Sequence, residues 1–179
     1  MKLTSIFLAL AGALILTGCD SPALLSLDPL VTDQDKAFDP TLLGAWGSSQ
    51  DKDLCIIRRD GDSGYAVTYL SAGSVRQFTA RLFRVGDASM LDLTPEGSDD
   101  FQVAGHALVR IWAEGGVLRW AYLDTEWLRK QASQLLPNRA DGKRVVLTAP
   151  GAAVRALVAK FGVDDKAHGE TIAWQRVQF

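Results

Sequence analysis

The sequence predicts a mainly β protein of the α+β class, built as an antiparallel meander with two short helices before and after a late strand. Two observations support this prediction. From Leu42 onward, short runs of β-type residues follow one another closely, and glycine-bearing turns such as Asp60–Gly64 and Gly115-Gly116 separate them. Such spacing favours hairpins over βαβ units. Two later segments instead repeat their apolar residues with helical spacing.

The first element is an amino-terminal apolar run. Lys2 precedes uncharged residues from Leu3 to Gly18, and the run ends in Leu16-Thr17-Gly18-Cys19. A positive residue, a short apolar run and a small-residue cleavage site are typical of a secretory signal peptide, here residues 1–18. The run is shorter than the roughly 20 apolar residues that a spanning helix needs.

The tetrapeptide at residues 16–19 resembles the lipobox of bacterial lipoproteins. The resemblance implies diacylglycerol on the Cys19 sulfur, cleavage after Gly18 and acylation of the new amino terminus, so that the lipid holds the protein on a membrane. Asp20 resembles the enterobacterial signal that retains lipoproteins at the inner membrane. We therefore expect an envelope protein on the periplasmic face of the inner membrane, with the outer membrane as the alternative.

Residues 19–38 are expected to form a flexible tether, because they combine Ser21-Pro22 and Asp28-Pro29 with a polar run and show no sustained periodicity. Charge is nearly balanced, with 19 Lys and Arg residues against 21 Asp and Glu residues. This balance argues against a disordered chain, a nucleic-acid-binding protein and a polycationic membrane-surface protein.

The remaining residues, 39–179, are expected to form one β domain. Alternation of residues places Tyr65 and Tyr69 on one face of a strand and Trp120 on a face with Leu118. The expected strands are Leu42–Ser48, Leu54–Arg59, Tyr65–Leu70, Val75–Val85, Ser89–Leu93, Ala107–Ala113, Val117–Leu123, Arg144–Thr148 and Thr171–Phe179. The expected helices are Thr125–Leu136, which ends before Pro137, and a second one from Pro150 to Gly162 with Val154, Leu157, Val158 and Phe161 on one stripe.

Gly44-Ala45-Trp46 follows Asp39-Pro40 and resembles the Gly-x-Trp entry to a lipocalin barrel. That resemblance implies that the Trp46 indole closes one end of the barrel and that Arg176, on the last strand, stacks on it. The chain departs from the lipocalin pattern because it lacks the Thr-Asp-Tyr-type motif and has two late helices where a lipocalin usually has one. Residues 80–86 and 91–95 also resemble uncharacterised bacterial lipoproteins, a likeness that carries no activity.

The sequence does not predict an enzyme. Gly61-Asp62-Ser63-Gly64 resembles the serine motif of chymotrypsin-like proteases, but His106 and His168 both follow Ser63, whereas in those proteases the histidine comes first. A hairpin turn explains the same residues. Cys55 and the two histidines stand far apart in a pattern typical of neither metal sites nor cofactor loops. We therefore expect no metal and no cofactor, and we expect Cys55 to be a buried apolar residue.

Two functions remain open. A barrel with an open interior would bind a lipophilic small molecule, with Tyr65, Tyr69, Trp112 and Trp120 as lining residues. A barrel plugged by its own side chains would instead dock an envelope protein through a sheet edge or a helix face; the predicted helices carry Arg129, Lys130, Arg155 and Lys160 on their polar sides. An aromatic-lined void of roughly 300 Å³ or more would favour the ligand.

Overall fold

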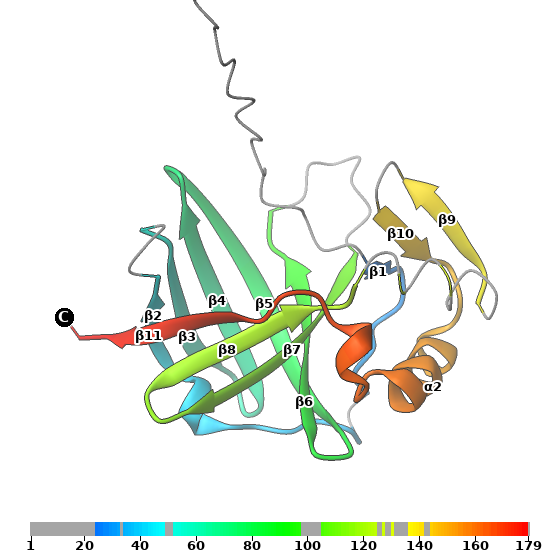
Figure 1. The fold of residues 1–179 in the computed structure, drawn as a ribbon, viewed down its shortest axis with the longest axis horizontal. Helices are drawn as coiled ribbons and strands as arrows, with labels where there is room; N and C mark the ends of the chain where they lie inside the picture. The colour runs from blue at the N-terminus through cyan, green and yellow to red at the C-terminus, as the bar shows by residue number, and fades with distance from the viewer. Residues whose placement is uncertain are drawn as a thin grey trace, which may run out of the picture.

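A computed structural model describes residues 24–32, 34–48, 52–97, 105–124, 136–141 and 144–178, together with Trp127 and Lys130. Its centre is a closed antiparallel barrel of eight strands, in the order β6-β5-β4-β3-β2-β11-β8-β7, and pairing of β6 with β7 closes it (Figure 1). The barrel strands are β2 (Gly44–Gly47), β3 (Leu54–Asp60), β4 (Gly64–Ser71), β5 (Ser74–Val85), β6 (Ala88–Pro95), β7 (His106–Glu114), β8 (Val117–Tyr122) and β11 (Ile172–Val177).

The predicted mainly β, antiparallel architecture is confirmed. The one α-helix that the described residues show in full is α2 (Gly151–Phe161), which corresponds to the predicted second helix. The predicted first helix, Thr125–Leu136, lies almost wholly outside the described residues. Three further strands extend the sheet from the start of β7, in the order β1 (Leu24–Ser26), β10 (Arg144–Leu147) and β9 (Asn138–Asp141).

The barrel interior is filled by apolar side chains that alternate along each strand. Tyr65 and Val67 on β4 face this interior, and so do Ala80 and Leu82 on β5. The buried members of this cluster are Leu42, Trp46, Cys55, Ile57, Tyr65, Val67, Ala80, Leu82, Leu91, Val109, Ile111, Leu118 and Trp174. Leu42 belongs to the short 3₁₀ helix η1 (Pro40–Leu42), so the prediction of a strand from Leu42 is wrong for its first residues. Pro40 suits the first turn of a helix because its nitrogen has no hydrogen to donate.

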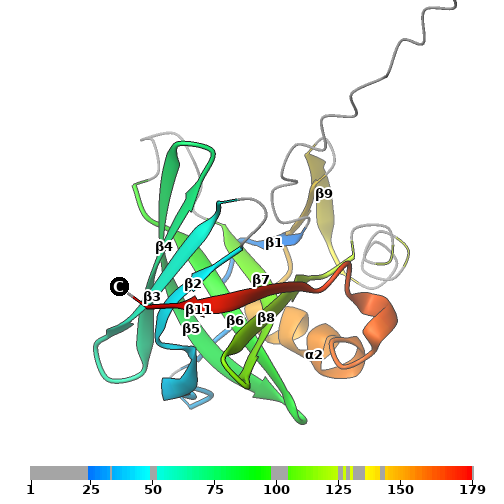
Figure 2. The ribbon, with the colours of Figure 1, turned by 60° about the vertical axis from the view of Figure 1, so that its left-hand side comes forward.

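A second core lies outside the barrel wall. Phe83 and Val85 point away from the interior on β5, and α2 packs against this side through Val154, Leu157 and Val158. Figure 2 shows α2 beside the barrel, outside its wall. Gly151 is required at the start of α2, because a Cβ there would lie 2.3 Å from the carbonyl oxygen of Pro29. The second core therefore joins α2 to the amino-terminal segment as well as to the barrel.

Residues 24–38 are not the flexible tether that the sequence predicts. Residues of β1 pair with both β7 and β10, and the Leu27 amide donates to the Leu147 carbonyl at 3.1 Å. Leu30 is 0% exposed and Val31 is 7% exposed. The segment crosses the outer wall of the barrel as a strap with only a short strand, and therefore its burial leaves no periodic signal in the sequence. We call residues 24–32 and 34–38 the amino-terminal strap.

Candidate functional site

The three residues expected to close the barrel lie together. The Trp46 side chain is 0% exposed, and its Nε1 donates to the Leu42 carbonyl at 2.9 Å. The Arg176 Cζ lies 4.2 Å from the centroid of the Trp46 ring, and its Nη1 donates to the Leu43 carbonyl at 2.9 Å. Gly44 has a φ of +138°, and a Cβ there would lie 2.4 Å from Arg176 Nη1. Only glycine lets the guanidinium approach this closely.

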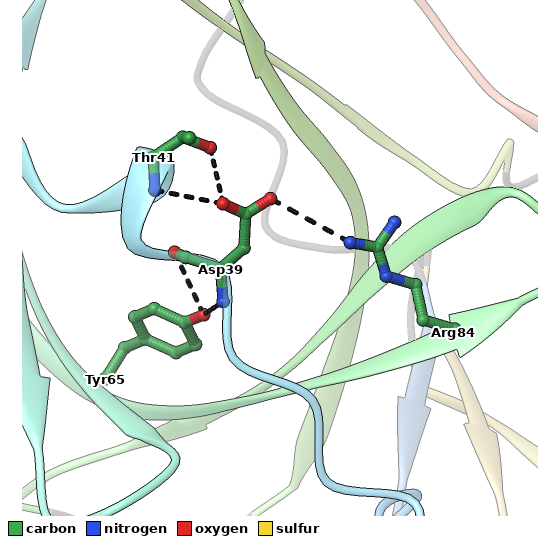
Figure 3. A network of polar contacts seen from close by, with 4 residues as sticks. All are labelled: Asp39, Thr41, Tyr65 and Arg84. Carbon is green, nitrogen blue, oxygen red and sulfur yellow. Dashed lines mark hydrogen bonds and ion pairs between the residues drawn. The ribbon is translucent and has the colours of Figure 1, made fainter.

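A polar network at the same end holds η1 against β4 (Figure 3). The Asp39 amide donates to the Tyr65 hydroxyl at 2.7 Å, and that hydroxyl donates to the Asp39 carbonyl at 3.3 Å. The Asp39 carboxylate accepts hydrogen bonds from the Thr41 amide at 2.9 Å and from the Thr41 hydroxyl at 2.6 Å. The Arg84 Nη2 lies 3.9 Å from Asp39 Oδ2. Phe38 stacks on the Tyr65 ring with the centroids 5.1 Å apart. Tyr65 therefore joins structural elements at the closed end.

Burial is also the main influence on the ionisation of this tyrosine. It raises the pKa of the Tyr65 phenol, and the nearby Asp39 carboxylate acts in the same direction. The hydrogen bond with the Asp39 backbone and the Arg84 guanidinium act in the opposite direction. Tyr65 therefore keeps its proton at neutral pH and can donate it to the Asp39 carbonyl.

Four aromatic rings on β4, β8 and β11 gather in a second group. The Trp120 ring centroid lies 5.5 Å from that of Trp174 and 5.1 Å from that of Tyr122, while Tyr69 stacks on Trp174 at 5.8 Å. The Tyr69 hydroxyl donates to the Asp53 carboxylate at 2.6 Å. Trp120 Nε1 is buried and has no hydrogen-bond partner among the described residues. These rings pack on one another and against the interior cluster of the barrel.

The structure separates the four residues predicted to line a ligand cavity. Tyr69 and Trp120 both contact Trp174, whereas Tyr65 contacts Asp39 and Phe38. Trp112 lies on the outer face, because Val109 and Ile111 on the same strand belong to the interior and alternation turns Trp112 outward. The Arg110 Cζ lies 5.3 Å from the centroid of the Trp112 ring. Sequence alternation alone does not reveal which set of side chains on β7 faces inward, because Trp112 and Ile111 are both apolar.

The sequence also singled out Cys19, Asp20, Arg129 and Cys55. Cys19 and Asp20 lie outside the described residues, as does Arg129. Cys55 is buried inside the barrel, and its burial raises the pKa of the thiol to about 12. Within the part of the chain that the structure describes, no group of three or more potential metal ligands lies together.

One polar cluster was missed by the sequence analysis. Asp92 on β6 is 4% exposed, and its carboxylate accepts from the Leu30 amide at 2.9 Å and contacts His106 Nδ1 at 2.9 Å. The Thr94 hydroxyl lies 3.2 Å from the same nitrogen. These residues line a pocket of about 330 Å³ on the outer wall, together with Pro29, Val31, Thr79 and Arg81. The sequence signal for this cluster was Asp92 itself, a charged residue between Leu91 and Leu93. That signal does not predict burial, because an acidic residue on the outer face of a strand is normally exposed to solvent.

A second pocket, of about 310 Å³, lies between the β2–β3 connection and β11 and is lined by Gly47, Ser48, Lys52, Asp53, Leu54, Gln175 and Val177. Neither pocket is lined by the aromatic residues of the barrel interior. The described residues also include no helix with the length and apolar character needed to cross a bilayer. No family model, no curated protein and no solved structure matches the chain.

Proposed function

We propose that this protein is a lipid-anchored component of the bacterial cell envelope that docks a protein partner and has no enzymatic activity. The observation that carries the proposal is the filled barrel interior, where Trp46, Tyr65 and Trp174 are each at most 5% exposed. A lumen packed in this way leaves the outer surface for recognition. The lipid on Cys19 would hold that surface at the membrane, and Asp20 favours the inner one.

The lipocalin resemblance supports a barrel that is rigid at the end where Trp46 and Arg176 lie. Gly44, Trp46 and Arg176 make the contacts that the resemblance implies for a Gly-x-Trp strand and a final arginine. Two arginine hydrogen bonds to the backbone, at Leu43 and Thr41, fix the connection into β2. We take the domain to be lipocalin-like in this sense, with a plugged core in place of a ligand cavity.

The docking surface that we propose lies on the outer faces of β3, β4 and β5. Leu54 pairs with Leu70, and Leu70 pairs with Val75, so three apolar residues adjoin across three strands. They alternate with the interior residues Cys55 and Tyr69, and Val75 is 63% exposed. A partner with a complementary apolar surface would bury them, because apolar area removed from water stabilises an interface.

Photo-crosslinking in intact membranes tests the docking proposal. A photoreactive amino acid replaces Val75 in one variant and Lys160, an exposed residue of α2, in the matched control. We expect one discrete crosslinked protein at Val75 and none at Lys160. The absence of any crosslink above background at Val75, or equal crosslinks at both positions, would reject this docking surface.

Metabolic labelling with palmitate tests the anchor separately. The wild-type protein is expected to take up the label and to sediment with membranes, whereas a Cys19→Ser variant is expected to do neither. Label that persists in the Cys19→Ser variant would show that the lipobox is not the site of acylation.

A second candidate function, binding of a lipophilic small molecule, is favoured by one observation. Trp120 Nε1 is a buried donor without a partner among the described residues, and the rings of Tyr122 and Trp174 pack edge-on against Trp120. A ligand with a hydrogen-bond acceptor would satisfy this donor. Native mass spectrometry and titration with a hydrophobic fluorophore test this function; no bound mass and no saturable signal would reject it.

A further inference from the structure

The pocket under the amino-terminal strap has walls from three barrel strands. β5 contributes Thr79 and Arg81, β6 contributes Asp92 and Thr94, and β7 contributes His106. Pro29 and Val31 of the strap cover one side, and the volume is about 330 Å³. We propose that this pocket binds a phosphate group. The proposal concerns a site separate from the docking surface and goes beyond the proposed function.

Asp92 fixes the orientation of the histidine. An ionised carboxylate only accepts hydrogen bonds, so the 2.9 Å contact requires that Nδ1 of His106 carry the hydrogen. Nε2 is then the ring nitrogen left for a ligand: in the neutral ring it accepts a hydrogen bond from a P–OH group, and in the protonated ring it donates to a phosphate oxygen. The His106 side chain keeps 15% of its surface accessible. A histidine held by a buried carboxylate in this way is pre-organised to contact a bound group.

The other side chains favour an anion over a metal ion. Arg81, Thr79 and Thr94 all line the pocket, and the guanidinium and hydroxyl groups of such residues donate to phosphate oxygens. Both oxygens of Asp92 already have donors, namely the Leu30 amide and His106 Nδ1. The lining residues include only one histidine and one carboxylate, fewer than the three or four ligands of a zinc site.

Two sources could supply the phosphate. Ser26 of β1 pairs directly with His106, so the pocket adjoins the point at which the described chain begins. Five residue steps separate Leu24 from Cys19, a reach of at most roughly 18 Å. A phospholipid headgroup is therefore within reach if Cys19 carries the anchor, and free phosphate can reach the pocket in either case.

Titration of the mature lipidated protein with inorganic phosphate, followed by the ¹⁵N resonances of the His106 ring, tests the site. We expect a saturable shift in the wild type and a half-saturation concentration at least about tenfold higher in Arg81→Gln. Arg76→Gln is the matched control, because Arg76 is an exposed residue of the same strand that does not line the pocket. Thr94→Val provides a second lesion in the pocket that leaves both charged residues in place.

Nanodiscs distinguish the two sources. A His106 shift in phosphatidylglycerol discs without added phosphate, absent in discs of a phosphate-free glycolipid, would identify the headgroup. A shift that requires added inorganic phosphate in both discs would identify the free anion. The proposal fails if neither addition shifts the His106 resonances, or if Arg76→Gln weakens the response as much as Arg81→Gln does. In that event Asp92 and His106 serve only to hold the strap.

Discussion

Leu30→Ala is predicted to destabilise the folded protein by about 3 kcal/mol. The Leu30 side chain is 0% exposed and lies in the outer core with Phe83, Met90 and Leu108. Replacing leucine by alanine removes about three methylene equivalents at about 0.8 kcal/mol each. Incomplete relaxation of the resulting cavity adds to this cost and brings the total within the measured range of about 2–5 kcal/mol for such substitutions.

Thermal and urea denaturation of the same variants measure the effect. For a domain of this size, about 3 kcal/mol lowers Tm by about 6–12 °C. The matched control is Leu27→Ala in the same strap, because the Leu27 side chain is 41% exposed and its truncation should cost less than about 1 kcal/mol. Equal stability of the two variants would refute the conclusion that the strap belongs to the core. It would instead support the flexible tether that the sequence predicts.

Three further predictions concern single side chains. Tyr65→Phe should cost about 1–3 kcal/mol, since it removes the acceptor of the Asp39 amide. His168 is held neutral by burial, which lowers its pKa from 6.5, so the free energy of unfolding should fall as pH drops below 6.5 and level off below the lowered value; His168→Gln should remove that component. Cys55, with a pKa of about 12, should resist iodoacetamide at pH 8 until the protein unfolds, as measured by mass in a Cys19→Ser background.

Each of these has a contradicting result. Unchanged stability of Tyr65→Phe would mean that the hydrogen bond to η1 contributes nothing net to folding. Identical pH profiles for the wild type and His168→Gln would assign the acid sensitivity to other groups. Rapid alkylation of Cys55 in the native protein would show that the barrel interior opens to solvent, which favours a ligand cavity.

The barrel could be predicted because its strands carry two local signals at once. On β4, Tyr65, Val67 and Tyr69 alternate with smaller or polar residues, and Gly64 stands at the turn before them. Period and turn chemistry then point to the same hairpin. The stripe of α2 was predictable for the same reason, since Val154, Leu157 and Val158 repeat with helical spacing and are buried.

The outer wall was not predictable in the same way, because its signals are long-range. Asp92 looks like an exposed residue until the strap covers it and the Leu30 amide supplies its donor, a contact between residues 62 positions apart. Trp112 looks like an interior residue because its bulk and apolar character fit either face of β7. In both cases the deciding partner lies on another element, which no window of sequence contains.

Burial of the strap also changes what the anchor would do. A tether of residues 19–38 would let the domain stand well away from the bilayer, whereas the described strand β1 begins at Leu24, so that only residues 20–23 lie between this strand and Cys19. Besides the Leu30 amide on Asp92, the strap is held by the ion pair of Asp35 with Arg155 and the hydrogen bond from the Gly151 amide to Asp28. A force applied to the lipid anchor would therefore act directly on β1 and the rest of the strap. A partner protein or a phosphate that stabilises the strap would in turn set how far the barrel stands from the membrane.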